Sequence, residues 1–165
     1  MNRTILGLVL VCAALPVSAA RDPGLDEIEP SAIEAVQAAC RETPFSMLVT
    51  IRNIKDTRGI ITLDLQGDDP AIWLKKGSKL ARFRARPEKG QIDVCIPVSK
   101  PGNYAVVLYQ DRNINFELNK NFLGLPSEPY GVSNDPAMNF GPPNMKDSLV
   151  AVRGPRTPVR VTLHN

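Results

Sequence analysis

The sequence predicts an all-β fold in which two antiparallel sheets pack face to face as a sandwich. Three observations support this prediction. After residue 44, apolar and polar residues alternate over short runs, as they do in half-buried strands. Turn-forming residues separate these runs at short intervals. No alternation of helix and strand patterns is present, which argues against a parallel sheet covered by helices.

Seven short strands follow from this pattern. The first shows the alternation most clearly, because Met47, Val49 and Ile51 fall on one face of an extended chain. The predicted strands span residues 45–52, 59–65, 79–86, 91–98, 103–110, 148–153 and 158–164. Seven strands separated by turns favour a sandwich of the immunoglobulin-like or prealbumin-like type, here with a short N-terminal helix and one long ordered loop.

The first twenty residues are predicted to be a signal peptide. Arg3 supplies a positive charge, residues 5–15 form an apolar core too short to span a bilayer, and residues 17–20 are small enough for cleavage. Cleavage near Ala19 or Ala20 would place the mature chain in the periplasm or outside the cell. No later segment has the apolar length of a transmembrane helix, so we expect a soluble product.

The chain is long enough for one domain after signal removal, because about 145 residues suit a single hydrophobic core. We expect a leader and short helix in residues 21–43 and the sandwich domain in residues 44–165. Nineteen basic residues then face 17 acidic ones, and this small excess argues against nucleic acid as a partner. The expected partner of this monomer is an unknown envelope component or a small ligand.

A short helix is predicted between Ser31 and Thr43. Ile33, Val36 and either Ala39 or Cys40 recur there at helical spacing, and Ser31 is placed to cap the first turn.

Two cysteines, Cys40 and Cys95, remain after the signal peptide is removed. In an oxidising compartment a single pair predicts a disulfide. The bond would close a loop of more than fifty residues, for which the chain-entropy treatment gives a stabilisation of about 4 kcal/mol. The alternative is a redox-active pair, but such pairs have close spacing, as in Cys-x-x-Cys, which this chain lacks.

The segment from Tyr104 to Pro143 carries most of the functional signals. Its part between residues 116 and 146 is too long for a hairpin connection, and long ordered loops in compact domains often bind ligands. Four of its residues are candidates for ligand binding: Tyr130, Asn134, Phe140 and Gly141. In the alternative interpretation, its large apolar residues fold back and cover one end of the core: Phe122, Leu123, Leu125, Tyr130, Phe140 and Met145.

The order of motifs in this region resembles the bacterial DUF2141 family. YAVVLYQDRNxN is followed by NFLGLPxEPYGVSN, by FGPPNxxDS and by a terminal strand, and the resemblance runs from about Met47 to Leu163. It implies a small exported β-sandwich and supplies no reaction. Many relatives carry a His-Asp pair at the strand end and glycine-rich spacers, and this chain differs at Gln110, Ile114, Phe116 and Asn119. These differences argue against a role that requires an imidazole or a tight metal cage.

Oxygen-bearing side chains occupy every second position at the start of the loop: Asp111, Asn113, Asn115, Glu117 and Asn119. A hard cation takes six to eight oxygen ligands, so this spacing predicts a weak calcium site. It resembles the start of an EF-hand loop, but Phe116 and Phe122 stand where that loop needs glycine and a bidentate glutamate. The alternative is that these side chains cap backbone groups in an irregular turn.

Basic residues dominate the segment from Lys75 to Lys89, where Arg82, Arg84 and Arg86 share one face of a strand. We interpret this stripe as a solvated outer face that discourages edge pairing. Binding of an anionic polymer or of lipid head groups is the alternative. Trp73, the only tryptophan, is interpreted as a core or rim residue.

Catalytic groups are few, since the only histidine is His164 and no nucleophile elbow, phosphate-binding loop or zinc spacing is present. We therefore predict a non-catalytic binding or envelope-associated module without a cofactor. The first alternative is a calcium-dependent binding module that uses the 111–119 loop. The second is a hydrolase whose carboxylates would meet in space: Asp64, Asp93, Asp111 or Asp147.

Overall fold

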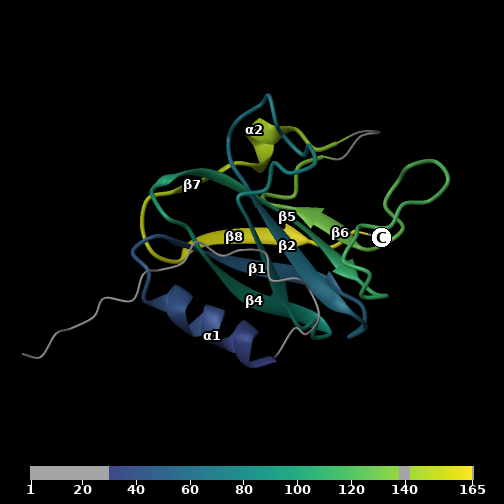
Figure 1. Cartoon of the computed structure of the whole chain (residues 1–165), viewed down its shortest axis with the longest axis horizontal. Helices are drawn as coiled ribbons and strands as arrows, with labels where there is room; N and C mark the ends of the chain where they lie inside the picture. Colours follow the sequence, from purple (N-terminus) through teal and green to yellow (C-terminus); the bar gives the residue numbers. More distant parts are fainter. Residues whose placement is uncertain (1–29, 138–141, 165) are drawn as a thin grey trace, which may run out of the picture.

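The structure, a computed structural model, describes residues 30–137 and 142–164 of the chain (Figure 1). The predicted signal peptide, most of the predicted leader, and two predicted ligand residues, Phe140 and Gly141, lie outside this part. Within the described ranges, no helix combines the length and the apolar character needed to cross a membrane.

The described part contains eight strands and two helices. The first helix is α1 (Pro30–Arg41). The strands are β1 (Ser46–Ile54), β2 (Ile60–Gln66), β3 (Ala81–Ala85), β4 (Gly90–Pro97), β5 (Gly102–Asp111), β6 (Tyr130–Val132), β7 (Val150–Val152) and β8 (Thr157–Thr162). The four-residue helix α2 (Met145–Ser148) precedes β7. All seven predicted strands are confirmed to within a few residues. β6 is an additional element inside the predicted loop, and α2 spans the end of that loop and the start of the strand predicted at 148–153.

Helix α1 begins one residue earlier than predicted. Pro30 is its first described residue, and Ser31 follows within the first turn. Proline suits this position because the first N–H groups of a helix have no partner within the helix.

The strands form two sheets that pack as a sandwich, which confirms the predicted fold class. One sheet has the order β4-β1-β8, and the other has the order β3-β2-β5, with β6 and β7 each pairing with β5. One pair departs from the antiparallel prediction, because β1 and β8 run parallel. No hairpin joins these two strands, so no tight turn fixes their relative direction.

The hydrophobic core lies between the sheets. Met47, Val49 and Ile51 on β1 are fully buried, as the alternation predicted, and they share the core with Leu63 of β2 and Leu108 of β5. Burying such side chains contributes roughly 1.5–3 kcal/mol each. The core therefore fixes the two sheets that carry the loops.

Strand β6 also links the two sheets. The N–H of Tyr130 donates to the carbonyl of His164 (2.9 Å), and the N–H of His164 donates back to Tyr130 (2.8 Å). Gly131 makes this approach possible, because a Cβ at that position would lie 2.6 Å from the carbonyl oxygen of Thr162. With this bridge, β3 and β4 are the outermost strands of the path that runs through both sheets.

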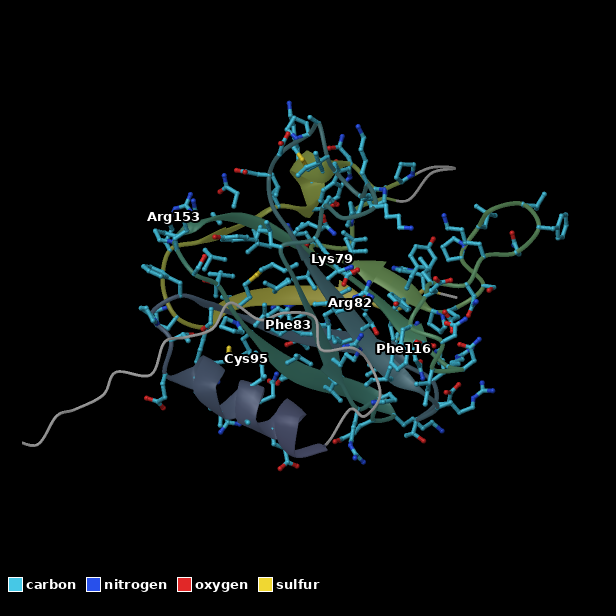
Figure 2. All side chains as sticks on the ribbon, viewed as in Figure 1. Lys79, Arg82, Phe83, Cys95, Phe116 and Arg153 are labelled. Atoms are coloured by element: carbon cyan, nitrogen blue, oxygen red, sulfur yellow. A yellow bond between two sulfur atoms is a disulfide. The ribbon has the colours of Figure 1, made fainter. Side chains whose placement is uncertain are left out.

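Helix α1 covers the edge strand β4. The predicted disulfide is confirmed, since Cys40 at the end of α1 is bonded to Cys95 on β4, with a Cα–Cα distance of 5.9 Å. The side-chain amide of Gln37 forms two hydrogen bonds with the backbone of Cys95: Nε2 donates to the carbonyl (3.1 Å) and Oε1 accepts from the N–H (2.6 Å). These contacts occupy an edge that could otherwise pair with another chain. Figure 2 shows Cys95 beside α1.

The loops gather at two opposite ends of the sandwich. One end of the sandwich holds residues 55–59, 86–89 and 112–129. The start of β2 lies there, because Ile60 pairs with Asp111 at the end of β5. The end of β8 lies there too, because Tyr130 forms a bridge with His164. We call residues 112–129 the long loop and this end the long-loop end. Residues 67–80 and 98–101 lie at the other end. Figure 2 shows Phe116 and Arg153 on opposite sides of the sandwich.

Candidate binding site

Asp111 organises the start of the long loop. It is fully buried at the end of β5, where Oδ1 accepts the N–H of Asn115 (3.2 Å) and Oδ2 accepts the N–H of Phe116 (2.7 Å). Asn113 and Asn115 repeat the pattern, because their side-chain oxygens accept the N–H groups two residues further on (3.2 and 3.1 Å). Carboxylate and amide oxygens thus hold a tight turn through backbone donors.

Four residues of the predicted calcium set, all except Glu117, accept hydrogen bonds within this turn through their side-chain oxygens. Oδ1 of Asn119 accepts hydrogen bonds from the amide groups of Asn113 (3.1 Å) and Asn115 (3.3 Å), and Glu117 is exposed. Among the described residues there is no group of three or more histidine, cysteine or acidic side chains placed to hold a metal. The hydrogen bonds match the turn-capping alternative, and calcium binding stays a prediction for titration.

A second buried carboxylate closes the loop from its far side. Glu128 is almost fully buried, and its two oxygens accept the N–H groups of Arg112 (2.9 Å) and Asn119 (3.1 Å). Sequence reasoning missed this residue. Its only local signal is an acid set between Pro126 and Pro129, in a segment that otherwise contains no charge after Lys120. Glu128 and Asp111 together fix both sides of the long loop.

Phe116 is held by three different contacts. Its N–H donates to Asp111, its carbonyl accepts the hydroxyl of Tyr109 (3.1 Å), and its ring lies 5.2 Å from the guanidinium carbon of Arg84. Burial raises the pKa of the Tyr109 hydroxyl, which keeps it protonated as a donor. Arg82 donates to both carboxylate oxygens of Asp64 (2.6 and 2.8 Å). Two arginines of the basic stripe therefore make contacts within the protein.

Gln110 ties the long-loop end to the β1–β2 connection. It is fully buried, and its amide nitrogen lies 2.9–3.1 Å from three oxygens: the Asp56 carbonyl, Asp56 Oδ1 and the Arg58 carbonyl. Asp56 also pairs with Arg58 and Arg112, each at 3.0 Å. The hydrogen bond from Arg58, with the charge of Arg112, lowers the pKa of Asp56 to about 2. Gln110 is one of the positions at which the sequence departs from the expected family pattern, and its amide anchors a neighbouring loop.

Two residues of the turn have a left-handed backbone. Ile114 has a φ of 57° and Phe116 a φ of 63°. Glycine adopts this conformation without strain, and other residues do not. The cost for other residues is roughly 1–2 kcal/mol, and a β-branched residue such as isoleucine is a clear outlier. Strain of this kind often marks functional segments.

Replacing Ile114 with asparagine is expected to raise the free energy of unfolding by about 1 kcal/mol, because asparagine tolerates the left-handed region. Ile114 is 52% exposed, so little packing is lost. Urea unfolding measures the difference. Ile72→Asn is the matched control, since Ile72 is 44% exposed without a positive φ, and it should change stability little. A loss of stability in Ile114→Asn would contradict the inference that the left-handed backbone at Ile114 is strained.

The far part of the long loop exposes three large apolar side chains. We call residues 121–125 the apolar tip; they lie between Lys120 and Pro126, which form a β-bridge. Phe122, Leu123 and Leu125 are 95%, 67% and 53% exposed. The prediction that these three fold back onto the sandwich is therefore wrong. Figure 1 shows the loop that carries the tip extending beyond the sheets, past β6.

Four of the five backbone N–H groups of the apolar tip have partners within it. Oδ1 of Asn121 accepts the N–H groups of Leu123 (2.9 Å) and Leu125 (3.1 Å). The N–H of Asn121 donates to the Leu125 carbonyl (2.8 Å), and the N–H of Gly124 donates to the Asn121 carbonyl (2.9 Å). Gly124 has a φ of 77°, which suits glycine. The tip is thus a closed turn that holds its apolar side chains outward.

Two of the predicted ligand residues have structural contacts. Tyr130 is half-buried at the start of β6, where its backbone pairs with His164. Asn134 follows β6 with a φ of 69°, and its amide donates to the carbonyls of Asp147 (3.2 Å) and Leu149 (3.0 Å), which holds α2. Phe140 and Gly141 are outside the described residues. Neither Tyr130 nor Asn134 lines the groove at the opposite end of the sandwich.

A groove of about 760 Å³ lies at the opposite end of the sandwich. Loops 67–80 and 98–101 and the start of β5 form most of its walls, with Trp73, Leu80 and Tyr104 among the lining side chains. Trp73 is a half-buried rim residue whose indole N–H donates to the carbonyl of Pro143 (3.0 Å). The volume is in the range of small-molecule sites. The sequence pattern did not predict this groove.

The four carboxylates of the hydrolase alternative lie on different elements. Asp64 is paired with Arg82. Asp111 lies opposite Ile60 on β2, and Asp64 is four residues further along that strand, so Asp64 and Asp111 are separated by about 13 Å along the sheet. Asp93 is on β4 in the other sheet, where it accepts the hydroxyl of Thr50 (2.7 Å). Asp147 is in α2.

Comparison with known proteins agrees with the resemblance seen in the motifs. No curated protein and no solved structure matches the chain. The model of one family, described as uncharacterized proteins conserved in bacteria, matches residues 49–160. This match covers more than half of the chain, from β1 through the long loop to β8. The protein, with its two-sheet sandwich and its long loop held by buried carboxylates, therefore belongs to the DUF2141 family.

Proposed function

We propose that this protein is a non-catalytic binding module that attaches to a component of the bacterial envelope through the apolar tip. One observation carries the proposal: Phe122, Leu123 and Leu125 are held outward together on a closed turn. Soluble domains seldom expose a contiguous cluster of large apolar side chains unless it meets a partner. An envelope component is the expected partner because the first twenty residues have the features of a signal peptide.

The construction of the long loop supports a binding role. Asp111 and Glu128 place buried carboxylates against backbone N–H groups on both sides of the loop. A loop that is already ordered loses little conformational entropy when it binds. The same hydrogen bonds support a non-catalytic function, because the two buried carboxylates of this end are occupied by backbone donors.

Serine replacements in the apolar tip are expected to weaken attachment to isolated bacterial envelope membranes by at least tenfold. Full burial of one large apolar side chain contributes roughly 1.5–3 kcal/mol. Partial burial of both Phe122 and Leu123 in the envelope therefore accounts for a tenfold difference in affinity. The measurement is co-sedimentation of the mature chain with the membranes, comparing wild type with Phe122→Ser/Leu123→Ser. Because both side chains are exposed, the variant should fold normally.

The matched control is Leu80→Ser, which removes a side chain that is 58% exposed at the opposite end of the sandwich. It should bind as wild type does. Equal binding by the tip variant and wild type would contradict the proposal. So would an equal loss in Leu80→Ser, which would indicate nonspecific adhesion.

A further inference from the structure

We propose that the partner of the apolar tip is the lipid bilayer itself, at a surface that carries anionic head groups. This inference rests on the proposed function and names the envelope component as lipid. Phe122 and Leu123 enter the boundary between head groups and acyl chains, while the sandwich stays in water.

The shape of the tip fits a flat, deformable surface. Phe122 is almost completely exposed, so it makes little contact with the rest of the chain. The loop projects from the long-loop end, away from both helices (Figure 1). A projecting knob reaches a flat bilayer before the body of the domain does. A protein partner would have to supply a pocket of matching shape, whereas acyl chains rearrange around apolar side chains.

The backbone of the tip is suited to leaving water. Unpaired N–H groups are costly in an apolar medium, and loops that enter one need internal partners. Four of the five N–H groups of the tip, those of Asn121, Leu123, Gly124 and Leu125, donate to an oxygen within the tip. No residue of the tip is charged, since its sequence is NFLGL. Insertion therefore removes apolar side chains from water without breaking these hydrogen bonds.

Charge at the long-loop end favours an anionic surface. Of the charged side chains that loops 55–59, 86–89 and 112–129 expose, five are basic and two are acidic. The basic ones are Lys55, Arg86, Lys89, Lys120 and Arg58, of which Arg58 is paired with Asp56, and the acidic ones are Glu88 and Glu117. Lys120 directly precedes the tip, where a basic residue meets head groups while the tip is inserted. The same excess of positive charge opposes docking of two copies through this end.

The decisive experiment uses the mature chain and protein-free vesicles. We expect it to float with vesicles of equal parts phosphatidylglycerol and phosphatidylcholine, and to bind pure phosphatidylcholine less tightly. Phe122→Ser/Leu123→Ser should lower binding to both vesicles by at least tenfold, and Leu80→Ser should leave it unchanged. Lys120→Gln should lower binding to the anionic vesicles alone, by about fivefold at low salt.

Tryptophan quenching gives a second readout with a built-in control. Brominated acyl chains should quench the indole introduced by Phe122→Trp. They should not quench Trp73, the only tryptophan of wild type, because it lies at the groove end. Quenching of Trp73 in wild type would show that the opposite end inserts, and would overturn the inference.

The two binding experiments separate this inference from the proposed function. Binding to native membranes that depends on the tip, without binding to protein-free vesicles, would leave the proposed function standing and overturn the lipid assignment in favour of an envelope protein. If the chain binds neither native membranes nor protein-free vesicles, both the proposed function and the lipid assignment are overturned. Concentration-dependent self-association that the tip variant abolishes, without vesicle binding, would identify a second copy as the partner and also overturn the inference.

Discussion

Removal of the disulfide by Cys40→Ser/Cys95→Ser is expected to lower the free energy of unfolding by about 4 kcal/mol. The bond joins residues 55 positions apart, so it removes a large loop-closure entropy from the unfolded chain. A domain of this size is stable by only about 5–15 kcal/mol in total, so the loss is a large part of its stability. Urea unfolding of wild type and the double variant measures it.

The same variant should loosen α1 against β4. Without the covalent link, the amide of Gln37 is the contact that still joins the helix to the backbone of Cys95. Hydrogen exchange should therefore accelerate in α1 and along the β4 edge more than in β1. Reductant is the control, because it should destabilise wild type by a similar amount and leave the double variant unchanged. Wild type that is equally stable with and without reductant would contradict the prediction.

Strands with a strong pattern could be predicted from the sequence, and strands defined by distant contacts could not. Met47, Val49 and Ile51 alternate along β1, and that alternation follows directly from burial on one face. Strand β6 has only three residues inside a loop rich in glycine and proline, so its pairing with β5 leaves no periodic signal. The parallel direction of β8 depends on contacts with β1 across more than a hundred residues, which local sequence does not encode.

The candidate site shows the same division. The spacing of oxygens after Asp111 correctly indicated a cluster of polar side chains, but their direction depends on the left-handed backbone at Ile114 and Phe116. That conformation turns the oxygens toward backbone N–H groups. The exposure of Phe122 could not be predicted either, because burial is the usual fate of phenylalanine. It follows from the side chain of Asn121, which closes the tip on itself.

Asp111→Asn is expected to lower the free energy of unfolding by about 3 kcal/mol. The side chain is fully buried, and each of its two oxygens accepts a backbone N–H. Asparagine has the same shape but only one acceptor oxygen, so its amide group must face either the N–H of Asn115 or the N–H of Phe116. One bond to a charged acceptor, worth about 1.5–3 kcal/mol, is replaced by two opposed donors. Thermal and urea unfolding measure the loss.

The control is Asp93→Asn, an exposed carboxylate on β4 that should change stability by less than about 0.5 kcal/mol. Calcium separates the two interpretations of Asp111. If it only caps the turn, the difference between wild type and Asp111→Asn is the same with and without millimolar calcium. If it is a ligand, calcium raises the midpoint of wild type and not of the variant. Because the turn positions the long loop, Asp111→Asn should also weaken membrane attachment through the apolar tip. A variant as stable as wild type would show that the buried carboxylate does not hold the loop.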